Sequence, residues 1–333
     1  MFADFAGPVV AATLGPMTTD AGPLTTDDVD APLLDRTDAS TSRPLPPALA
    51  AARADVIAGV RDLLAVPDAA LTRPWDWIGG SEEEVRYGAY RAAEALELAE
   101  VEARTAGAEA EADERQAARL IGPSTAARWD LHGLLMPIGE RQLDADPGGG
   151  EWPVRLAIGH IIGSQRAYAW GSAWWLEQGY DASDPALPAG IPDDVYTTLP
   201  DEATTEAAGT VDDLRTRLDT ILDLSMARFA ELRDDRLRLG ARWSGFPVTI
   251  GFRFGRWGSH IREHAIQVEK TFAMIGHVPS EPARLARHVL SAYGRAEAVV
   301  FGRTGVDDAV DRMARGAAEA RDALRAARDA AEA

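Results

Sequence analysis

The chain of 333 residues contains no cysteine, no asparagine and a single lysine, Lys270. The absence of cysteine excludes disulfides, thiolate metal ligands and a sulfur nucleophile carried by the protein itself. No stretch stays apolar for the roughly eighteen residues that a membrane-spanning helix needs. The N-terminus also lacks the basic start and apolar core of a secretory signal. We therefore expect a cytoplasmic protein that does not bind a membrane.

Positive charge is scarce as well, because 34 Lys and Arg stand against 53 Asp and Glu, for a formal net charge of −19. Phosphate backbones repel such a surface, and the arginines form no dense run, so we expect no nucleic-acid partner. The single lysine and the absence of asparagine, together with abundant alanine, indicate a GC-rich genome such as that of an actinobacterium. This inference rests on codon usage and not on protein physics.

The length and the 46% hydrophobic content are ordinary for a globular protein with a sizeable core. Apolar residues recur at helical spacing along most of the chain, which predicts an all-α fold of about eight helices. Ser81 followed by Glu84 has the capping-box pattern and predicts a helix start. Residues 242–254, with glycines and β-branched residues, predict a short extended excursion.

Composition divides the chain into four segments. Residues 1–45 are rich in Thr, Asp and Pro and predict an extended or flexible arm, or one that Leu33 and Leu34 anchor to the folded body. A helical region, a central helical bundle and a pair of C-terminal helices follow. Their predicted bounds are 46–120, 121–279 and 280–333, and the last segment is expected to pack against 46–120.

A faint internal repeat supports a second bundle. When Val85-Arg86 is set against Val154-Arg155, Arg91 aligns with His160. The first helix pair would then be a degenerate copy without the histidine. Chance similarity between amphipathic helices is the alternative explanation.

Two of the six histidines, His260 and His264, stand four residues apart in a predicted helix. Residues at this spacing share one helical face, roughly 5–6 Å apart at Cβ, so two imidazoles can converge on one metal ion. The third ligand would come from another helix, and His160 is the candidate because it lies among apolar residues in mid-helix. A satisfied core histidine, and a chance H-x-x-x-H on an exposed helix, are the plainer explanations.

Other polar and aromatic residues have mostly structural interpretations. His132 could face the same cavity, but an interface or surface role is favoured, and Trp243 and Trp257 could line a pocket beside the histidine helix. Arginines on helices usually extend to water, although three of them could bind an anionic substrate. The remaining residues considered are the arginines Arg155, Arg166 and Arg262, the core-type Trp170, Trp174 and Trp175, and the structural His277 and His288.

The stretches "WPVRLAIGH" (152–160) and "WSGFPVTIGFRFGRWGSHIREHAIQVEKT" (243–271) resemble the DinB-like family of four-helix bundles. The resemblance covers about residues 124–278. It is closest to the branch with thiol-dependent S-transferases and the N-terminal domain of mycothiol-dependent maleylpyruvate isomerases. It implies a DinB-like four-helix bundle for this part of the chain. The additional N- and C-terminal helices lie outside the resemblance, and our own expectation is that they form a second, degenerate bundle without a metal.

The resemblance also implies a divalent metal on His160, His260 and His264, and Gln267 is common at its position in such sequences. Three imidazole nitrogens with an open position are typical of catalytic zinc, although nickel, iron or manganese would also suit them. With no cysteine in the chain, a thiol would come from a small molecule, for which the resemblance suggests mycothiol. The expected function is a metal-dependent transferase or isomerase acting on a small electrophilic substrate.

Two other functions compete with this one. The first is a non-catalytic metal-binding or interaction module, since fold alone does not imply function, and the alanine-rich terminal helices would suit a homodimer. The second is a biosynthetic enzyme that uses the metal as a Lewis acid without any thiol.

Overall fold

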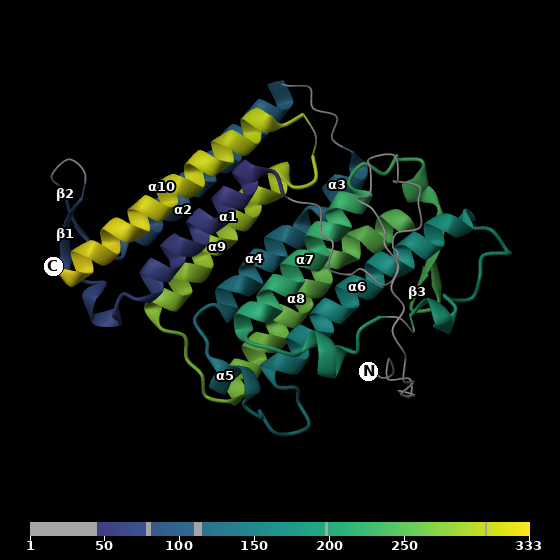
Figure 1. Cartoon of the computed structure of the whole chain (residues 1–333), viewed down its shortest axis with the longest axis horizontal. Helices are drawn as coiled ribbons and strands as arrows, with labels where there is room; N and C mark the ends of the chain where they lie inside the picture. Colours follow the sequence, from purple (N-terminus) through teal and green to yellow (C-terminus); the bar gives the residue numbers. More distant parts are fainter. Residues whose placement is uncertain (1–44, 78–80, 110–114, 197–198, 304) are drawn as a thin grey trace, which may run out of the picture.

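The computed structural model describes residues 45–77, 81–109, 115–196, 199–303 and 305–333. Within these ranges the chain is mainly helical, and its strands form two short antiparallel hairpins (Figure 1). The prediction of an all-α fold is therefore confirmed. The arm predicted for residues 1–45 lies, up to residue 44, outside the described residues.

The elements follow one another in a simple order. They are α1 (Pro47–Leu64), η2 (Asp68–Ala70), β1 (Pro74–Trp77), β2 (Ser81–Glu84), α2 (Tyr87–Glu109), α3 (Gln116–Ile121), α4 (Pro123–Leu135), α5 (Glu140–Asp144), α6 (Val154–Gln178), η3 (Asp193–Val195), the π-helical turn η4 (Glu202–Glu206), α7 (Val211–Phe229), η5 (Arg236–Arg238), β3 (Gly240–Trp243), β4 (Phe246–Thr249), α8 (Ile250–Met274), α9 (Glu281–Val300) and α10 (Asp307–Glu332).

The helix start predicted at Ser81 is wrong. Residues 81–84 form β2, which pairs antiparallel with β1, and α2 begins only at Tyr87. The aromatic residues of β1 favour a strand, and cross-strand hydrogen bonds satisfy the backbone groups that a helix cap would have satisfied. A capping-box pattern cannot anticipate a partner strand, which is why the local signal was misleading.

Of residues 242–254, for which an extended excursion was predicted, only the first half is extended. Strands β3 and β4 are joined by Ser244 and Gly245, whose φ angles of 48° and 82° suit the tight turn of a two-residue hairpin. From Ile250 onward the chain is helical, with the Thr249 side chain accepting a hydrogen bond from the Phe252 amide at 3.2 Å. This cap fixes the start of α8, the helix that carries His260 and His264.

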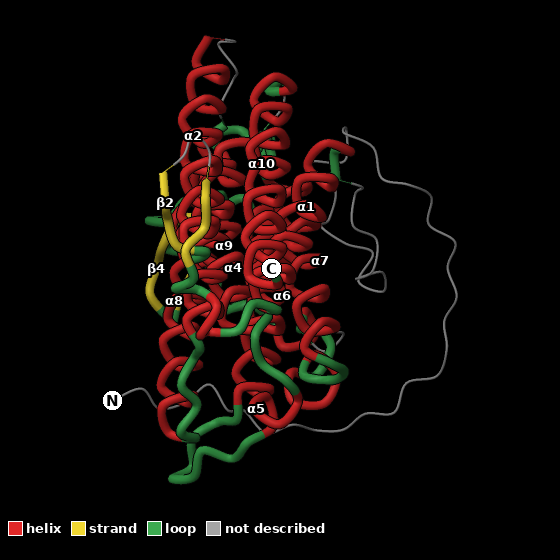
Figure 2. Tube along the Cα trace, turned by 90° about the vertical axis from the view of Figure 1, so that its left-hand side faces the viewer, coloured by secondary structure: helices red, strands yellow, loops and turns green. Residues whose placement is uncertain are grey.

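The helices gather into two groups, each around its own hydrophobic core (Figure 1). The middle bundle consists of α4, α6, α7 and α8, with α3 beside them. The terminal bundle consists of α1, α2, α9 and α10, so helices from both ends of the described chain pack together. In the perpendicular view the axes of the helices in both bundles have roughly the same direction, and the strands lie along one side (Figure 2).

The two bundles meet mainly where α4 packs against α9. Glycines allow the close approach, because a Cβ added at Gly133 would lie 2.6 Å from the Cα of Arg287, and one added at Gly294 would lie 2.8 Å from the Cβ of Trp129. The indole of Trp129 reaches from α4 into the terminal core, where it meets the ring of Tyr293 edge-on at 4.7 Å. The contact is thus a continuous packed interface.

A buried ion network crosses this interface. It consists of Arg53 of α1, Arg128 of α4, Asp223 of α7 and Glu297 of α9, so each bundle contributes two helices. The guanidinium of Arg53 donates to Asp223 at 2.6 Å and to Glu297 at 2.7 Å. The guanidinium of Arg128 donates to the same two carboxylates at 2.8 and 2.6 Å. Both guanidinium groups therefore contact the same two carboxylates, and the Asp219 carboxylate lies 3.5 Å from the Nε of Arg128 as well.

The network also sets the ionisation of its members. Burial by itself raises the pKa of Glu297, but the adjacent Arg53 and Arg128 outweigh it and lower that pKa to about 2. Arg128 and Glu297 are fully buried, so their charges are stable only as a set.

No helix among the described residues combines the length and the apolar character needed to cross a bilayer.

We expect Glu297→Gln to destabilise the protein by about 3–5 kcal/mol, because it leaves two buried guanidinium groups with one carboxylate between them. Glu97→Gln is the matched control, since Glu97 of α2 pairs with Arg295 of α9 at 2.9 Å while both side chains are about half exposed. Glu97→Gln should lower the free energy of unfolding by only about 0–1 kcal/mol. Urea unfolding measures both, and equal losses would contradict a special role for the network.

The stability difference between wild type and Glu297→Gln should also depend on pH. The pKa of Glu297 falls from an ordinary 4.5 to about 2 on folding, so its carboxylate stabilises the folded state above pH 4.5. This contribution is lost as the pH falls from 4.5 toward 2, where the group becomes protonated in both states. The unfolding free energies of wild type and Glu297→Gln should therefore converge as the pH falls through this window, and a difference that stays constant would contradict the assignment.

Candidate metal centre

Helix α8 presents His260 and His264 on one face. The adjoining face of the helix is held in the core by residues at helical spacing, among them Phe254, Trp257 and Ile261, all fully buried. The ring centroids of the two histidines are 4.4 Å apart, and their Nε2 atoms are 3.1 Å apart. The spacing seen in the sequence thus brings the two imidazoles together.

Helix α6 runs antiparallel to α8 and places His160 opposite this pair. The Gln165 amide donates to the Trp257 carbonyl at 3.3 Å, and Thr271 at the far end of α8 donates to the Trp152 carbonyl just before α6. The His160 ring lies 5.4 Å from that of His260 and 4.7 Å from that of His264. One candidate ligand nitrogen from each of the three histidines lies within 4.8 Å of the others.

The environment keeps the histidines of α8 neutral. His260 is only 6% exposed, and burial, followed by the neighbouring His264 and His160, lowers its pKa to about 2. Burial likewise lowers the pKa of His264, against the hydrogen bond that its ring donates to Gln267. Neutral imidazoles keep a lone pair on one ring nitrogen, which is the form that binds a metal.

Hydrogen bonds to the outer nitrogens orient two of the rings. His160 contacts Glu202 of η4 through Nδ1 at 2.8 Å, and His264 contacts the amide oxygen of Gln267 through Nδ1 at 2.7 Å. Since a carboxylate and an amide oxygen can only accept, both Nδ1 atoms are donors and both Nε2 atoms keep their lone pairs. The Nδ1 of His260 is buried without a hydrogen-bond partner among the described residues.

This donor set fits a divalent metal. Three imidazole nitrogens converge from two helices, and two of the rings make outer hydrogen bonds of the kind that metal-ligating histidines usually make. Three protein nitrogens leave a fourth position for water or substrate, as in catalytic zinc sites. Imidazole also suits nickel, iron and manganese, so the residues alone do not select one metal.

Aromatic residues surround the three histidines. The Tyr168 ring lies 5.2 Å from His260 and 4.9 Å from Trp243, and Trp152 lies 5.3 Å from His160. Burial raises the pKa of Tyr168, against the nearby Arg256 and Arg253, so its hydroxyl is protonated at neutral pH. Trp243, one of the two tryptophans considered as pocket-lining, is therefore near the site, whereas Trp257 is fully buried in the core.

The remaining histidines lie elsewhere. His132 is fully buried, with its Nε2 2.8 Å from Asp219 next to the buried ion network, so it neither faces the three histidines nor lies on the surface. His277 packs against Phe272 with ring centroids 4.9 Å apart, and His288 is exposed on α9. None of these three residues joins the cluster of His160, His260 and His264, and the exposed His288 does not have the structural surroundings expected for it.

Two of the three arginines considered as substrate ligands already form ion pairs with carboxylates of the chain. Arg155 pairs with Asp144 and Glu140, and Arg166 forms a buried pair with Glu206 at 2.6 Å. Arg262 is exposed on α8. The tryptophans of α6 are core residues or pack against the core, as their helical spacing indicated: Trp170, Trp174 and Trp175.

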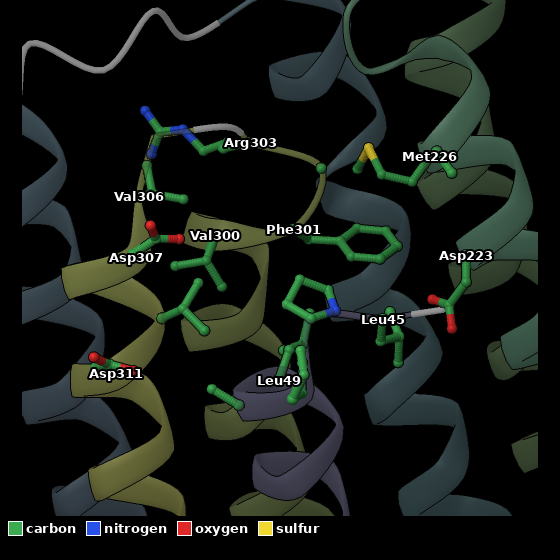
Figure 3. A pocket seen from close by; sticks show the side chains of 16 residues that line it. Leu45, Leu49, Asp223, Met226, Val300, Phe301, Arg303, Val306, Asp307 and Asp311 are labelled. Carbon is green, nitrogen blue, oxygen red and sulfur yellow. The ribbon is translucent and has the colours of Figure 1, made fainter. Parts of the chain in front are cut away.

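A cavity of about 380 Å³ lies at the junction of the two bundles, away from this site (Figure 3). Asp223 of the buried ion network and apolar residues such as Leu49 and Phe301 line it. None of the described residues that line it is a histidine, so this cavity and the histidine cluster are separate features.

Sequence patterns did not indicate two of the neighbours. Glu202 lies in a polar connection 42 residues beyond His160, where no periodicity relates it to the site. Tyr168 follows His160 by eight residues in the same helix, a spacing that places it near the same face. The helical period was therefore a usable signal for Tyr168, whereas no local signal existed for Glu202.

Comparison with known families gives one match. Residues 125–268 match the family model of the DinB superfamily, which confirms the resemblance noted over about 124–278. The matched segment begins in α4 and ends in α8, so the terminal bundle lies outside it. Neither a curated protein nor a solved structure matches the chain significantly.

In protein stripped of divalent metal, we expect His260→Leu to be at least as stable as wild type, because it removes a buried nitrogen that lacks a partner. Ile261→Ala, at the next position and fully buried, is the control and should lose about 2–5 kcal/mol. Urea unfolding in the presence of a chelator measures both. A comparable loss for His260→Leu would show that His260 stabilises the metal-free fold.

Proposed function

We propose that this chain, whose residues 125–268 match the family model of the DinB superfamily, is a metal-dependent transferase or isomerase that uses a small-molecule thiol. The observation that supports it is the convergence of three histidine nitrogens from α6 and α8. His160, His260 and His264 would hold the metal, with zinc as the first candidate. A divalent metal held there would supply a Lewis acid that lowers the pKa of a thiol or water.

The chain's own residues account for the rest of the arrangement. Tyr168 packs against His260 and the exposed Trp152 against His160, while Trp243 packs against Tyr168, and these rings limit the water that reaches the histidines. The Tyr168 hydroxyl, protonated at neutral pH, is a hydrogen-bond donor for a polar group of the substrate. These features suit a small electrophilic molecule that has both an apolar part and a polar part.

The thiol must come from outside the protein, because the chain contains no cysteine. Mycothiol is the thiol that the family resemblance and the actinobacterial composition favour. In the proposed reaction the S–H bond of the thiol breaks and its sulfur bonds to an electrophilic carbon of the substrate. The bond broken at that carbon, either a π bond or the bond to a leaving group, keeps its electron pair, which takes up a proton from solvent in exchange for the thiol proton. In an isomerase the new carbon–sulfur bond would break again after the substrate has rearranged.

Metal content tests the first half of this proposal. Purified wild-type protein, stripped by chelator and reloaded, should take up one divalent zinc ion per chain, whereas His264→Ala should lose stoichiometric binding. His288→Ala, which removes an exposed histidine on α9, should bind as wild type does. Wild-type protein that binds no zinc, nickel, iron or manganese would refute a metal site.

Thiol consumption tests the second half. With zinc-loaded protein, mycothiol should disappear in the presence of a panel of small electrophiles, and His264→Ala should lose this activity while His288→Ala keeps it. Turnover without any thiol would point instead to Lewis-acid catalysis in a biosynthetic enzyme. No turnover by fully loaded protein would point to a non-catalytic metal-binding module.

A further inference from the structure

We propose that Glu202 is a positioning residue for the histidine cluster: its carboxylate holds the His160 ring with Nδ1 protonated, so that the lone pair of Nε2 faces His260 and His264. The inference rests on the proposed function in that the three histidines are taken as metal ligands. It adds a residue outside the ligand set, from a segment that the sequence patterns left unassigned.

The three histidines differ in what contacts their outer nitrogens. His160 donates to a carboxylate oxygen of Glu202 at 2.8 Å, and His264 donates to the neutral amide of Gln267 at 2.7 Å. His260 has no such partner among the described residues. A hydrogen bond to a carboxylate is charge-assisted and makes the imidazole a stronger electron donor. His160 is thus the ligand whose tautomer and basicity are most strongly determined.

Glu202 is free for this contact. The other acidic residue at the far end of η4, Glu206, is buried and lies against two arginines, Arg166 at 2.6 Å and Arg217 at 3.7 Å. Glu202 forms an ion pair with His160 but with no arginine or lysine of the described chain. An acidic side chain that is 45% exposed would ordinarily extend into solvent, so its direction toward the imidazole requires a structural cause.

Part of the cause is the close contact between η4 and α6. A Cβ added at Gly159 would lie 2.5 Å from the Glu202 carbonyl oxygen, and one added at Gly163 would lie 2.4 Å from the Glu202 Cγ. The two glycines lie on either side of His160 along α6. Only residues without a side chain allow the turn to pack directly on the helix here, and this packing brings Glu202 within reach of the ring.

The other part is the anchoring of the turn itself. Asp201 caps its start, accepting hydrogen bonds from the amides of Ala203 and Thr204 at 3.1 and 2.8 Å. Glu206 ties its end to α6 through the buried Arg166. A single π-helical turn is rare, and such turns often occur at functional sites. Since both of its ends are fixed, the position of Glu202 is determined by the backbone.

Zinc affinity and histidine tautomer together test the proposal. Glu202→Ala should weaken zinc binding by about 10–100-fold in a chelator competition, the usual effect of removing such an outer partner. Glu202→Gln should weaken it less, because its amide oxygen still accepts from Nδ1. Gly163→Ala, which touches no histidine, should act in the same direction by displacing the Glu202 side chain.

Glu263→Gln is the matched control. Glu263 is an exposed carboxylate of α8 beside His264 that pairs with Arg256 at 2.8 Å and makes no hydrogen bond to a histidine of the described chain. Its change removes the same charge near the site without removing an outer partner, so zinc binding should stay within about threefold of wild type. An equal loss for Glu263→Gln and Glu202→Ala would overturn the positioning role in favour of general electrostatics.

Nitrogen-15 NMR of the metal-free protein gives a readout independent of metal binding. The His160 ring should be the Nδ1-protonated tautomer in wild type and Glu202→Gln, and a mixture of tautomers in Glu202→Ala. The same tautomer populations in wild type and Glu202→Ala would overturn the proposal. Should wild-type protein bind no zinc, the metal site would fail, while this measurement would still decide the role of Glu202.

Discussion

The four buried charges of Arg53, Arg128, Asp223 and Glu297 determine how the two bundles sit together. Each guanidinium contacts both carboxylates, and the four residues come from α1, α4, α7 and α9. Burying so many charges is unfavourable unless every one has its partners, so the network stabilises one arrangement of the helices over others. The glycines and Trp129 that let α4 pack closely on α9 lie in the same interface that the network crosses.

The histidine cluster depends on this framework in a different way. Its most buried member, His260, is neutral and has a ring nitrogen without a hydrogen-bond partner among the described residues. Such a site costs stability, and it persists because α6 and α8 are held by well-packed cores on their other faces. The interface thus pairs opposite charges, whereas the cluster brings three imidazoles together, and this arrangement makes the cluster the candidate metal site.

Helical patterns predicted much of the architecture because apolar periodicity is a local property. The all-α class follows from it, and so does the pairing of His260 with His264, which depends only on the helical repeat. The start predicted at Ser81 was wrong because a strand partner outcompeted a cap. The approach of Glu202 to His160 was missed because it depends on two glycines in one helix and an anchored turn 42 residues away.

By itself, then, the sequence determined the helices, the absence of a sulfur nucleophile, the acidic surface and the shared face of two histidines. Composition and short-range spacing suffice for these properties. Only the tertiary structure decided how close His160 lies to that pair, and that Arg53 and Glu297, 244 residues apart, would form an ion pair. Contacts of this kind depend on how whole helices pack, and no local pattern encodes the distance between two side chains so far apart along the chain.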